Sequence, residues 1–142
     1  MSDENKALVE KFINEVYNAG NTDAIQDLCV PGSMMAGGLV GQFMAMKSAF
    51  PDNHFTIETL IAEGDRVVAQ MTVRGTNSGP MLGLPAFGKL DTPIPPTGKS
   101  VMTTDISIFK IADGRIASIA TEFDQINLLR QLGWTFTPPG FA

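Results

Sequence analysis

The chain of 142 residues is large enough for one domain with its own hydrophobic core, and we expect a single domain over residues 1–142. Hydrophobic residues make up 44% of the chain and charged residues 18%, which excludes a disordered protein. A formal net charge of -5, without any cluster of lysine and arginine, predicts that the protein does not bind nucleic acid.

Three helices are predicted in the first 50 residues. In the first, the apolar residues Leu8, Phe12 and Val16 recur every four positions and form one face of a helix. A short second helix follows, and the segment VPGSMMAGG at 30–38 then breaks the helical pattern and is predicted to be a loop. The third helix, again with apolar residues at helical spacing, ends before Pro51 because proline cannot continue a helix.

The second half of the chain is predicted to form a sheet. Alternation of apolar and polar residues indicates four strands, with the sequences HFTIETLIA, RVVAQMTVRGTN, SVMTTDISIFKI and RIASIATEF. The turn sequences EGDR and ADGR join the strands in pairs, and the second contains the Asp-Gly pair typical of hairpins. A closing helix follows near residue 125. Helices followed by a mostly antiparallel sheet predict an α+β domain.

The segment 78–98, SGPMLGLPAFGKLDTPIPPTG, interrupts this pattern between the second and third strands. It contains five of the nine prolines of the chain and four of its glycines, together with several apolar residues. A loop of this length in a compact domain usually forms a lid or a binding loop. We therefore expect a structureless segment that covers either the domain's own cavity or a neighbouring subunit.

Four segments in a fixed order resemble one known family. GTNSGPMLGLP, PPTGKSV, IFKIADGRI and EFDQINLLRQLG are similar to segments of the SnoaL-like polyketide cyclases, which belong to the nuclear transport factor 2-like superfamily. The resemblance implies a cone-shaped, curved and mostly antiparallel sheet that packs on the N-terminal helices and encloses a pocket. It also implies a homodimer and chemistry without a cofactor.

Asp124 stands where the last strand meets the closing helix, and two roles are open for it. From the residues alone, an aspartate at this junction is expected to cap the helix by accepting from backbone N–H groups. The resemblance implies instead that Asp124 is the general acid/base of an intramolecular aldol cyclisation. With both considered, we expect Asp124 to be catalytic or to contact the ligand.

Other polar residues are candidates to support this chemistry. Ala120, Glu122 and Asp124 share one face of a regular strand, so that Glu122 and Asp124 form an acidic pair if this face looks into the pocket. Asn77 either donates from its amide to a substrate enolate or forms a turn at the strand end. Asp105 is either a further pocket carboxylate or a mark of the water-facing side of its strand, and we favour the latter.

Apolar residues are expected to line the pocket and contact the substrate, and we name Phe43, Met46 and Met71 for this role, although such residues more often form packing. The only cysteine is Cys29 and the only histidine is His54, so we expect no metal site.

The sequence thus predicts a cofactor-independent enzyme of the lyase or isomerase type, which cyclises a polyketide-like carbonyl or ester substrate. The alternatives are a non-catalytic module that binds a small apolar ligand, favoured by departures from the family at Met71, Asn77 and Ala120, and a related isomerase or hydrolase. A polar N-terminus without a signal-like apolar run predicts a cytoplasmic protein, and no segment approaches the length of a membrane span.

Overall fold

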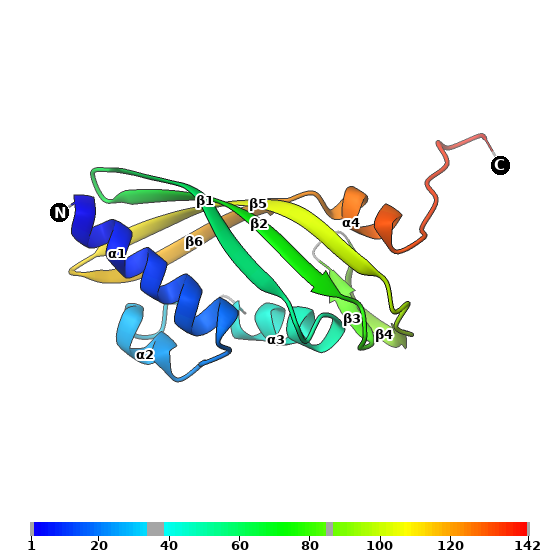
Figure 1. Cartoon of the computed structure of the whole chain (residues 1–142), viewed down its shortest axis with the longest axis horizontal. Helices are drawn as coiled ribbons and strands as arrows, with labels where there is room; N and C mark the ends of the chain where they lie inside the picture. The colour runs from blue at the N-terminus through cyan, green and yellow to red at the C-terminus, as the bar shows by residue number, and fades with distance from the viewer. Residues whose placement is uncertain (1, 34–38, 85–86, 142) are drawn as a thin grey trace.

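The computed structural model describes residues 2–33, 39–84 and 87–141 (Figure 1). The helices are α1 (Ser2–Phe12), the π-helix η1 (Ile13–Asn18), α2 (Ala24–Leu28), α3 (Leu39–Ala49) and α4 (Gln125–Gln131). The strands are β1 (His54–Glu63), β2 (Arg66–Thr76), β3 (Met81–Leu84), β4 (Gly88–Ile94), β5 (Ser100–Ala112) and β6 (Arg115–Phe123). None of the helices within these ranges is long and apolar enough to cross a membrane.

The predicted α+β fold is confirmed. Four long strands form an antiparallel sheet in the order β1-β2-β5-β6, and β3 pairs with β4 in a separate hairpin. Helices α1, α2 and α3 lie along one side of the large sheet, which we call its inner face (Figure 1). Of the predicted loop at 30–38, residues 34–38 lie outside the described part of the chain.

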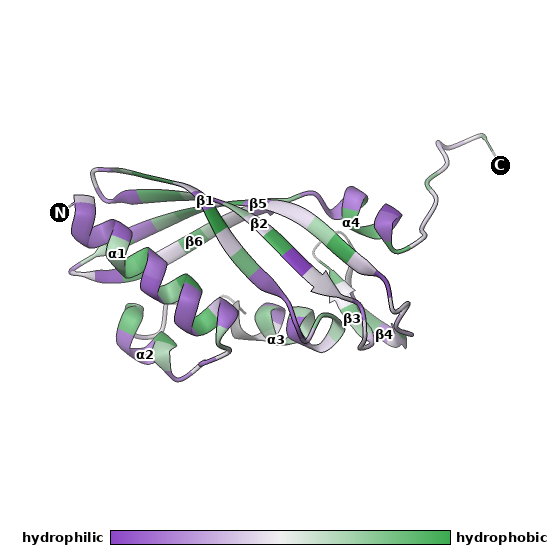
Figure 2. Cartoon of the chain, viewed as in Figure 1, coloured by the Kyte–Doolittle hydropathy of each residue, from purple (hydrophilic) through white to green (hydrophobic). Residues whose placement is uncertain are grey.

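The first helix continues from α1 directly into η1. Its apolar residues recur at helical spacing, as Figure 2 shows along α1, and Phe12, Ile13 and Val16 are almost completely buried against the sheet. In the wider π-turn, the N–H of Ala19 donates to the carbonyl of Asn14 at 2.9 Å. These contacts anchor the N-terminal part of the chain on the inner face.

Strand β5 shows most clearly how the sheet separates two faces. Every second residue from Val101 to Ile111 is buried, and every residue between them is exposed. Because directly paired residues of neighbouring strands point to the same face, the register assigns Met71 of β2 and Phe123 of β6 to the inner face together with Asp105.

The segment 78–98 is not structureless, so that prediction is wrong. It forms the hairpin β3–β4, in which Met81 pairs with Ile94 and Leu84 with Gly88. The hairpin packs on α3 and α4 in an apolar cluster, separate from the cluster under α1. The buried members of this second cluster are Ala49, Phe50, Met81, Leu84, Val101, Leu128, Leu129 and Leu132.

The last helix is fixed to an open part of the sheet edge. Strand β6 ends opposite Asp105, so residues 100–104 of β5 have no partner strand on that side. There the side-chain amide of Gln131 accepts from the N–H of Met102 at 2.9 Å and donates to its carbonyl at 2.8 Å. A single side chain thus takes the place of a pairing strand and holds α4 against β5.

Candidate active site

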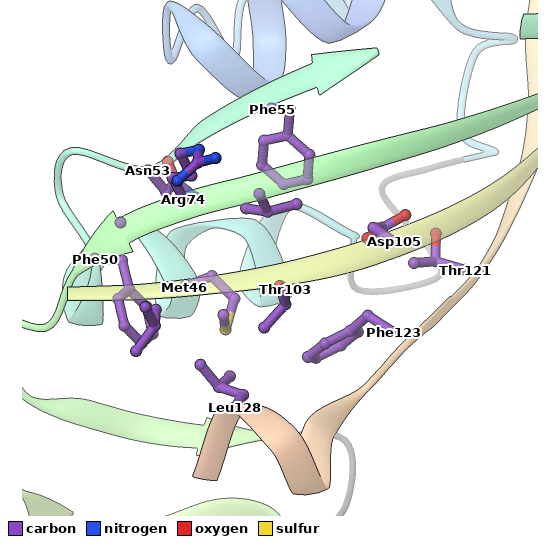
Figure 3. Close-up of a pocket in the computed structure, with 13 residues that line it drawn as sticks. Met46, Phe50, Asn53, Phe55, Arg74, Thr103, Asp105, Thr121, Phe123 and Leu128 are labelled. Atoms are coloured by element: carbon purple, nitrogen blue, oxygen red, sulfur yellow. The ribbon is translucent and has the colours of Figure 1, made fainter. Parts of the chain in front are cut away.

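A cavity of about 120 Å³ lies between the inner face of the sheet, α3 and α4, where the two apolar clusters meet. Its lining is mostly apolar and comes from segments that are far apart in the sequence (Figure 3). The lining residues are Met46, Phe50, Asn53, Phe55, Val73, Arg74, Gly75, Val101, Thr103, Asp105, Thr121, Phe123 and Leu128. Such a concave apolar site with few polar groups is the usual form of a small-molecule site.

Asp105 is the acidic residue of this lining. Its side chain is on the inner face of β5 and the residue is only 8% exposed. Burial raises the pKa of the Asp105 carboxyl to about 6, although the hydrogen bond from Ser107 acts in the opposite direction. The prediction that Asp105 marks the water-facing side of its strand is therefore wrong, and the alternative of a pocket carboxylate is confirmed.

Two hydroxyl groups connect Asp105 to the pocket rim. The Oγ of Ser107 donates to Oδ1 of Asp105 at 2.8 Å and lies 2.8 Å from Oγ1 of Thr121. Because Ser107 has one proton and gives it to the carboxylate, Thr121 is the donor to Ser107. Thr121 is exposed and also lines the cavity, so a continuous chain of hydrogen bonds leads from the exposed hydroxyl to the buried carboxyl.

On the side of the cavity toward the first core cluster, uncharged aromatic side chains and the thiol of Cys29 lie close together. Tyr17 stacks on Phe43 with ring centroids 6.0 Å apart and also contacts Phe55. Burial, and secondarily the charge of Asp105, raises the pKa of Tyr17 well above its usual range. Burial also raises the pKa of the Cys29 thiol to about 11. Both groups are neutral near neutral pH, so neither adds a second negative charge beside the carboxylate.

The three apolar residues predicted to contact the substrate have different positions. Met46 lines the cavity, and its contact with a substrate stays a prediction. Phe43 and Met71 are instead buried in the first core cluster and are not part of the lining, although Met71 pairs directly with Asp105 across the strands. They form the packing that surrounds the site.

Asp124 lies outside the cavity lining and is exposed. Its Oδ1 accepts from the backbone N–H of Asn127 at 2.9 Å, so Asp124 is the N-cap of α4. The cap interpretation is confirmed, and the expectation that this carboxylate faces the pocket is wrong. The physical reason is that a capping side chain must turn toward the free N–H groups of its helix.

The acidic pair predicted on the last strand also lies away from the cavity. Ala120 and Glu122 do share a face, but their partners in β5 are Ile108 and Ile106 on the exposed outer face of the sheet. Their placement as substrate-binding residues is therefore wrong. Thr121, the residue between them on β6, points inward, because side chains alternate along a strand and its partner is Ser107.

Asn77 is buried, but both ends of its amide are already bonded. Its Nδ2 donates to the carbonyls of Ala49 and Gly79, both at 3.1 Å, and its Oδ1 accepts from the N–H and the hydroxyl of Thr97 at 2.9 Å. The expected role as donor to a substrate enolate is thus wrong, since no free donor remains and Asn77 is outside the lining. Instead, Asn77 joins the two ends of the hairpin segment to α3.

The polar lining residues Asn53, Arg74, Thr103 and Thr121 were not among the residues predicted to bind or react, and Asp105 was only the less favoured alternative. For Asp105 a signal existed, because Val101, Phe109 and Ile111 lie at even spacings from it and predict a buried face. The signal was hidden by Ile106 and Ile108, which make the other face of the strand apolar as well.

Comparison with known proteins identifies the family. The family model described as SnoaL-like polyketide cyclase matches residues 7–132. The chain belongs to this family. The resemblance of the four sequence segments is thereby confirmed, whereas no curated protein is similar to the chain at a significant level.

Solved structures share the fold of this SnoaL-like protein. TsrD from Streptomyces laurentii is 29% identical with a TM-score of 0.72, and the match covers 92% of this chain and 96% of that chain. AclR from Streptomyces galilaeus is 22% identical with a TM-score of 0.79, covering 98% and 91%. IdmH from Streptomyces antibioticus is 23% identical with a TM-score of 0.72, covering 92% and 99%. AclR and IdmH are less than 25% identical to this chain, so their similarity shows a shared fold alone.

Proposed function

We propose that this SnoaL-like protein is a cofactor-independent enzyme that catalyses an intramolecular aldol-type cyclisation of a polyketide-like carbonyl or ester substrate. The observation that supports the proposal is the buried carboxyl of Asp105, the acidic residue in the lining of a mostly apolar cavity. Family membership favours the substrate class. We assign the role of general acid/base to Asp105 in place of Asp124, because Asp105 lines the cavity and Asp124 caps a helix.

The reaction needs one group that first removes and then returns a proton. The Asp105 carboxylate takes a proton from the carbon α to a carbonyl, which leaves an enolate. The enolate carbon attacks a second carbonyl carbon of the same molecule, forming a C–C bond and an alkoxide. The alkoxide takes the proton back from the Asp105 carboxyl, so atoms and charge balance without a further reactant.

The surroundings of Asp105 suit this role. A pKa raised to about 6 makes the carboxylate a stronger base than an exposed aspartate, yet leaves most of it ionised at neutral pH. The apolar walls exclude water from the enolate and hold the reacting carbons close together. The hydroxyls of Ser107 and Thr121 orient the carboxylate through the hydrogen-bond chain.

The size of the cavity limits what it holds. About 120 Å³ is close to the roughly 150 Å³ of an engineered apolar cavity that binds benzene in another protein. One ring-sized part of a substrate therefore fits beside Asp105. A larger carbonyl compound places only its reacting part in the cavity.

We further propose that the protein is a homodimer formed through the outer face of the sheet. A row of apolar residues crosses this face, since Ile61 pairs with Val68, Val68 with Ile108, and Ile108 with Ala120. Ile61 is 57% exposed and Ile108 is 43% exposed. A contiguous apolar face of this kind is typical of an interface, and a second copy of the same face is self-complementary about a two-fold axis.

Proton removal can be tested separately from ring closure. We would incubate the protein in D₂O with a panel of aromatic β-keto esters and measure deuterium uptake at the α-carbon by NMR. Wild type and Asp124→Asn are expected to catalyse uptake, whereas Asp105→Asn is expected to lose it. Because both variants replace an aspartate by the same amide, Asp124→Asn is a matched control.

The outcomes separate the candidate functions. Loss of uptake in Asp124→Asn with retention in Asp105→Asn would move the catalytic role back to Asp124. Binding of the esters without uptake in any form of the protein would instead identify a non-catalytic binding module.

A further inference from the structure

Thr103 brings an unpaired hydroxyl group to the cavity. The residue is 8% exposed, belongs to the lining and lies on the inner face of β5, two residues before Asp105. Its Oγ1 makes no hydrogen bond to any of the residues that the structure describes. Nor is this oxygen enclosed, because Oδ1 of Asn53 is the one unbonded side-chain atom of the described residues that has no accessible surface. The hydroxyl of Thr103 is therefore accessible from the cavity that the residue lines.

The other hydroxyl groups near Asp105 already donate within the protein. Ser107 donates to Asp105, and Thr121 donates in turn to Ser107. Arg74 is also part of the lining, but it is exposed and its register assigns its side chain to the outer face of β2. Of the two threonines in the described lining, Thr103 is thus the one whose proton is available to a ligand.

The spacing of Thr103 and Asp105 suits one carbonyl group and the carbon next to it. Figure 3 shows the two residues along β5, with Asp105 beside Thr121 and Thr103 farther toward Met46. Residues two positions apart in a strand lie about 7 Å apart on the same face. In a ketone, the oxygen and the α-carbon are about 2.4 Å apart.

Both contacts can be made at once. A carbonyl oxygen lies about 2.8 Å from a hydroxyl that donates to it. A carboxylate approaches a reacting carbon to about 3–3.5 Å. Together with the length of the ketone itself, these distances span slightly more than the spacing of the two residues, so a bent path from Thr103 through the ligand to Asp105 fits.

We propose that the hydroxyl of Thr103 donates a hydrogen bond to a carbonyl oxygen of the ligand and places the neighbouring α-carbon beside Asp105. The ligand class is a ring-sized apolar ketone or ester. The hydrogen bond to the carbonyl requires no catalysis and can be tested by binding alone.

A second consequence rests on the proposed function. When Asp105 removes the proton from the α-carbon, negative charge develops on the carbonyl oxygen. The hydrogen bond from Thr103 then strengthens and stabilises the enolate, which is the usual effect of a donor that is already in position. Thr103 would thus supply the donation that was expected from Asn77.

The competing role of Thr103 is packing alone. Threonine suits strands, and in that case its methyl group fills space while the hydroxyl contributes nothing to binding. Valine has nearly the shape of threonine but no hydroxyl, whereas serine keeps the hydroxyl and loses the methyl group. The two replacements therefore separate donation from packing.

The test compares cyclohexanone with methylenecyclohexane, which has a CH₂ group in place of the carbonyl oxygen. Dissociation constants are measured by NMR titration at pH 8, where Asp105 is ionised and cannot itself donate. We expect the preference for cyclohexanone to fall about fivefold in Thr103→Val and to be kept in Thr103→Ser. Thr104→Val, the same substitution on the exposed outer face, is the matched control and should keep the preference.

Three results would overturn the proposal. They are an unchanged preference in Thr103→Val, an equal loss in Thr103→Val and Thr103→Ser, and failure of wild type to bind cyclohexanone. If Thr103→Val does not fold, the infrared stretching frequency of cyclohexanone bound to wild type decides. It should be lower than in cyclohexane as solvent, because a hydrogen bond weakens the C=O bond, and an equal frequency would refute the donation.

The same variants keep this proposal apart from the proposed function. If both are right, deuterium uptake from β-keto esters falls about a hundredfold in Thr103→Val and far less in Thr103→Ser. A cyclohexanone preference that depends on Thr103, together with no uptake by wild type, would reject the enzyme and retain the carbonyl site. Uptake that depends on Asp105, together with a preference that ignores Thr103, would do the reverse.

Discussion

Replacing Asp105 with asparagine should make the protein more stable at neutral and alkaline pH. The carboxylate is charged and buried, so folding removes it from water, and this burial is the main cause of its raised pKa. Asparagine has the same shape, carries no charge, and can still accept the hydrogen bond that Ser107 donates. The substitution therefore removes the cost of burying the charge and keeps most of the contacts.

The pKa of Asp105 gives the size and sign of the effect. Burial raises the pKa from its ordinary value of 3.8 to about 6 in the folded protein. Between these two values the folded state binds more protons than the unfolded state, so the stability of wild type falls as the pH rises from about 4 to about 6. At about 1.4 kcal/mol per pKa unit, the loss at pH 8 is at most about 3 kcal/mol.

Urea unfolding of wild type and Asp105→Asn at intervals between pH 4 and pH 8 measures this difference. The free energies of unfolding should nearly agree at pH 4, and the variant should be up to about 3 kcal/mol more stable at pH 8, or about 10 °C higher in Tm. Asp124→Asn, which changes an exposed carboxylate to another good capping residue, should show no such dependence. A variant less stable than wild type at pH 8, or a difference that does not vary with pH, would refute the reasoning.

Four further outcomes are expected. Asn77→Ala should lower the free energy of unfolding in urea by about 3 kcal/mol, because it leaves buried partners unbonded; an unchanged value would contradict its role. Asp124→Ala should cost about 1 kcal/mol and leave deuterium uptake unchanged. Uptake by wild type should rise with pH and level off above about pH 6, as Asp105 ionises; a flat profile below pH 6 would argue against it. Ile108→Glu should convert the proposed dimer to a monomer in light scattering, and a persisting dimer would place the interface elsewhere.

The elements of the fold were predictable because each has a strong local pattern. The four-residue repeat of Leu8, Phe12 and Val16 predicted the first helix, and Pro51 marked the end of the third. The four long strands agree with the alternating segments to within a few residues. Which face of a strand turns inward is a different question, and it depends on contacts between segments far apart in the sequence.

Asp105 and Asp124 show this limit clearly. Strand β5 has apolar residues on both faces, so alternation alone could not decide whether Asp105 or Ile106 pointed to the core. At Asp124 the sequence did indicate a cap, and the resemblance outweighed that indication. The cap was correct, because the free N–H groups of a helix need an acceptor whatever the family.

The hairpin β3–β4 was missed because its prolines suggested an irregular segment. Proline lacks the N–H that a central strand needs, but it is tolerated where one edge of a strand is unpaired. Strand β4 belongs to a two-stranded sheet, so Pro93 is accommodated in it without breaking a second ladder of hydrogen bonds. Its apolar residues pack on α3 and α4, contacts that no local pattern could have indicated.

The two hydrogen bonds between Gln131 and Met102 are expected to protect the protein from aggregation in concentrated solution. An unpaired strand edge with free N–H and C=O groups can pair with the edge of another molecule and start aggregation. Residues 100–104 form such an edge beyond the end of β6, and the amide of Gln131 occupies it at Met102. Helix α4, which contributes Leu128 to the cavity lining, thereby also shields this edge of the sheet, and loss of the Gln131 side chain would leave the edge at Met102 free to pair with another molecule.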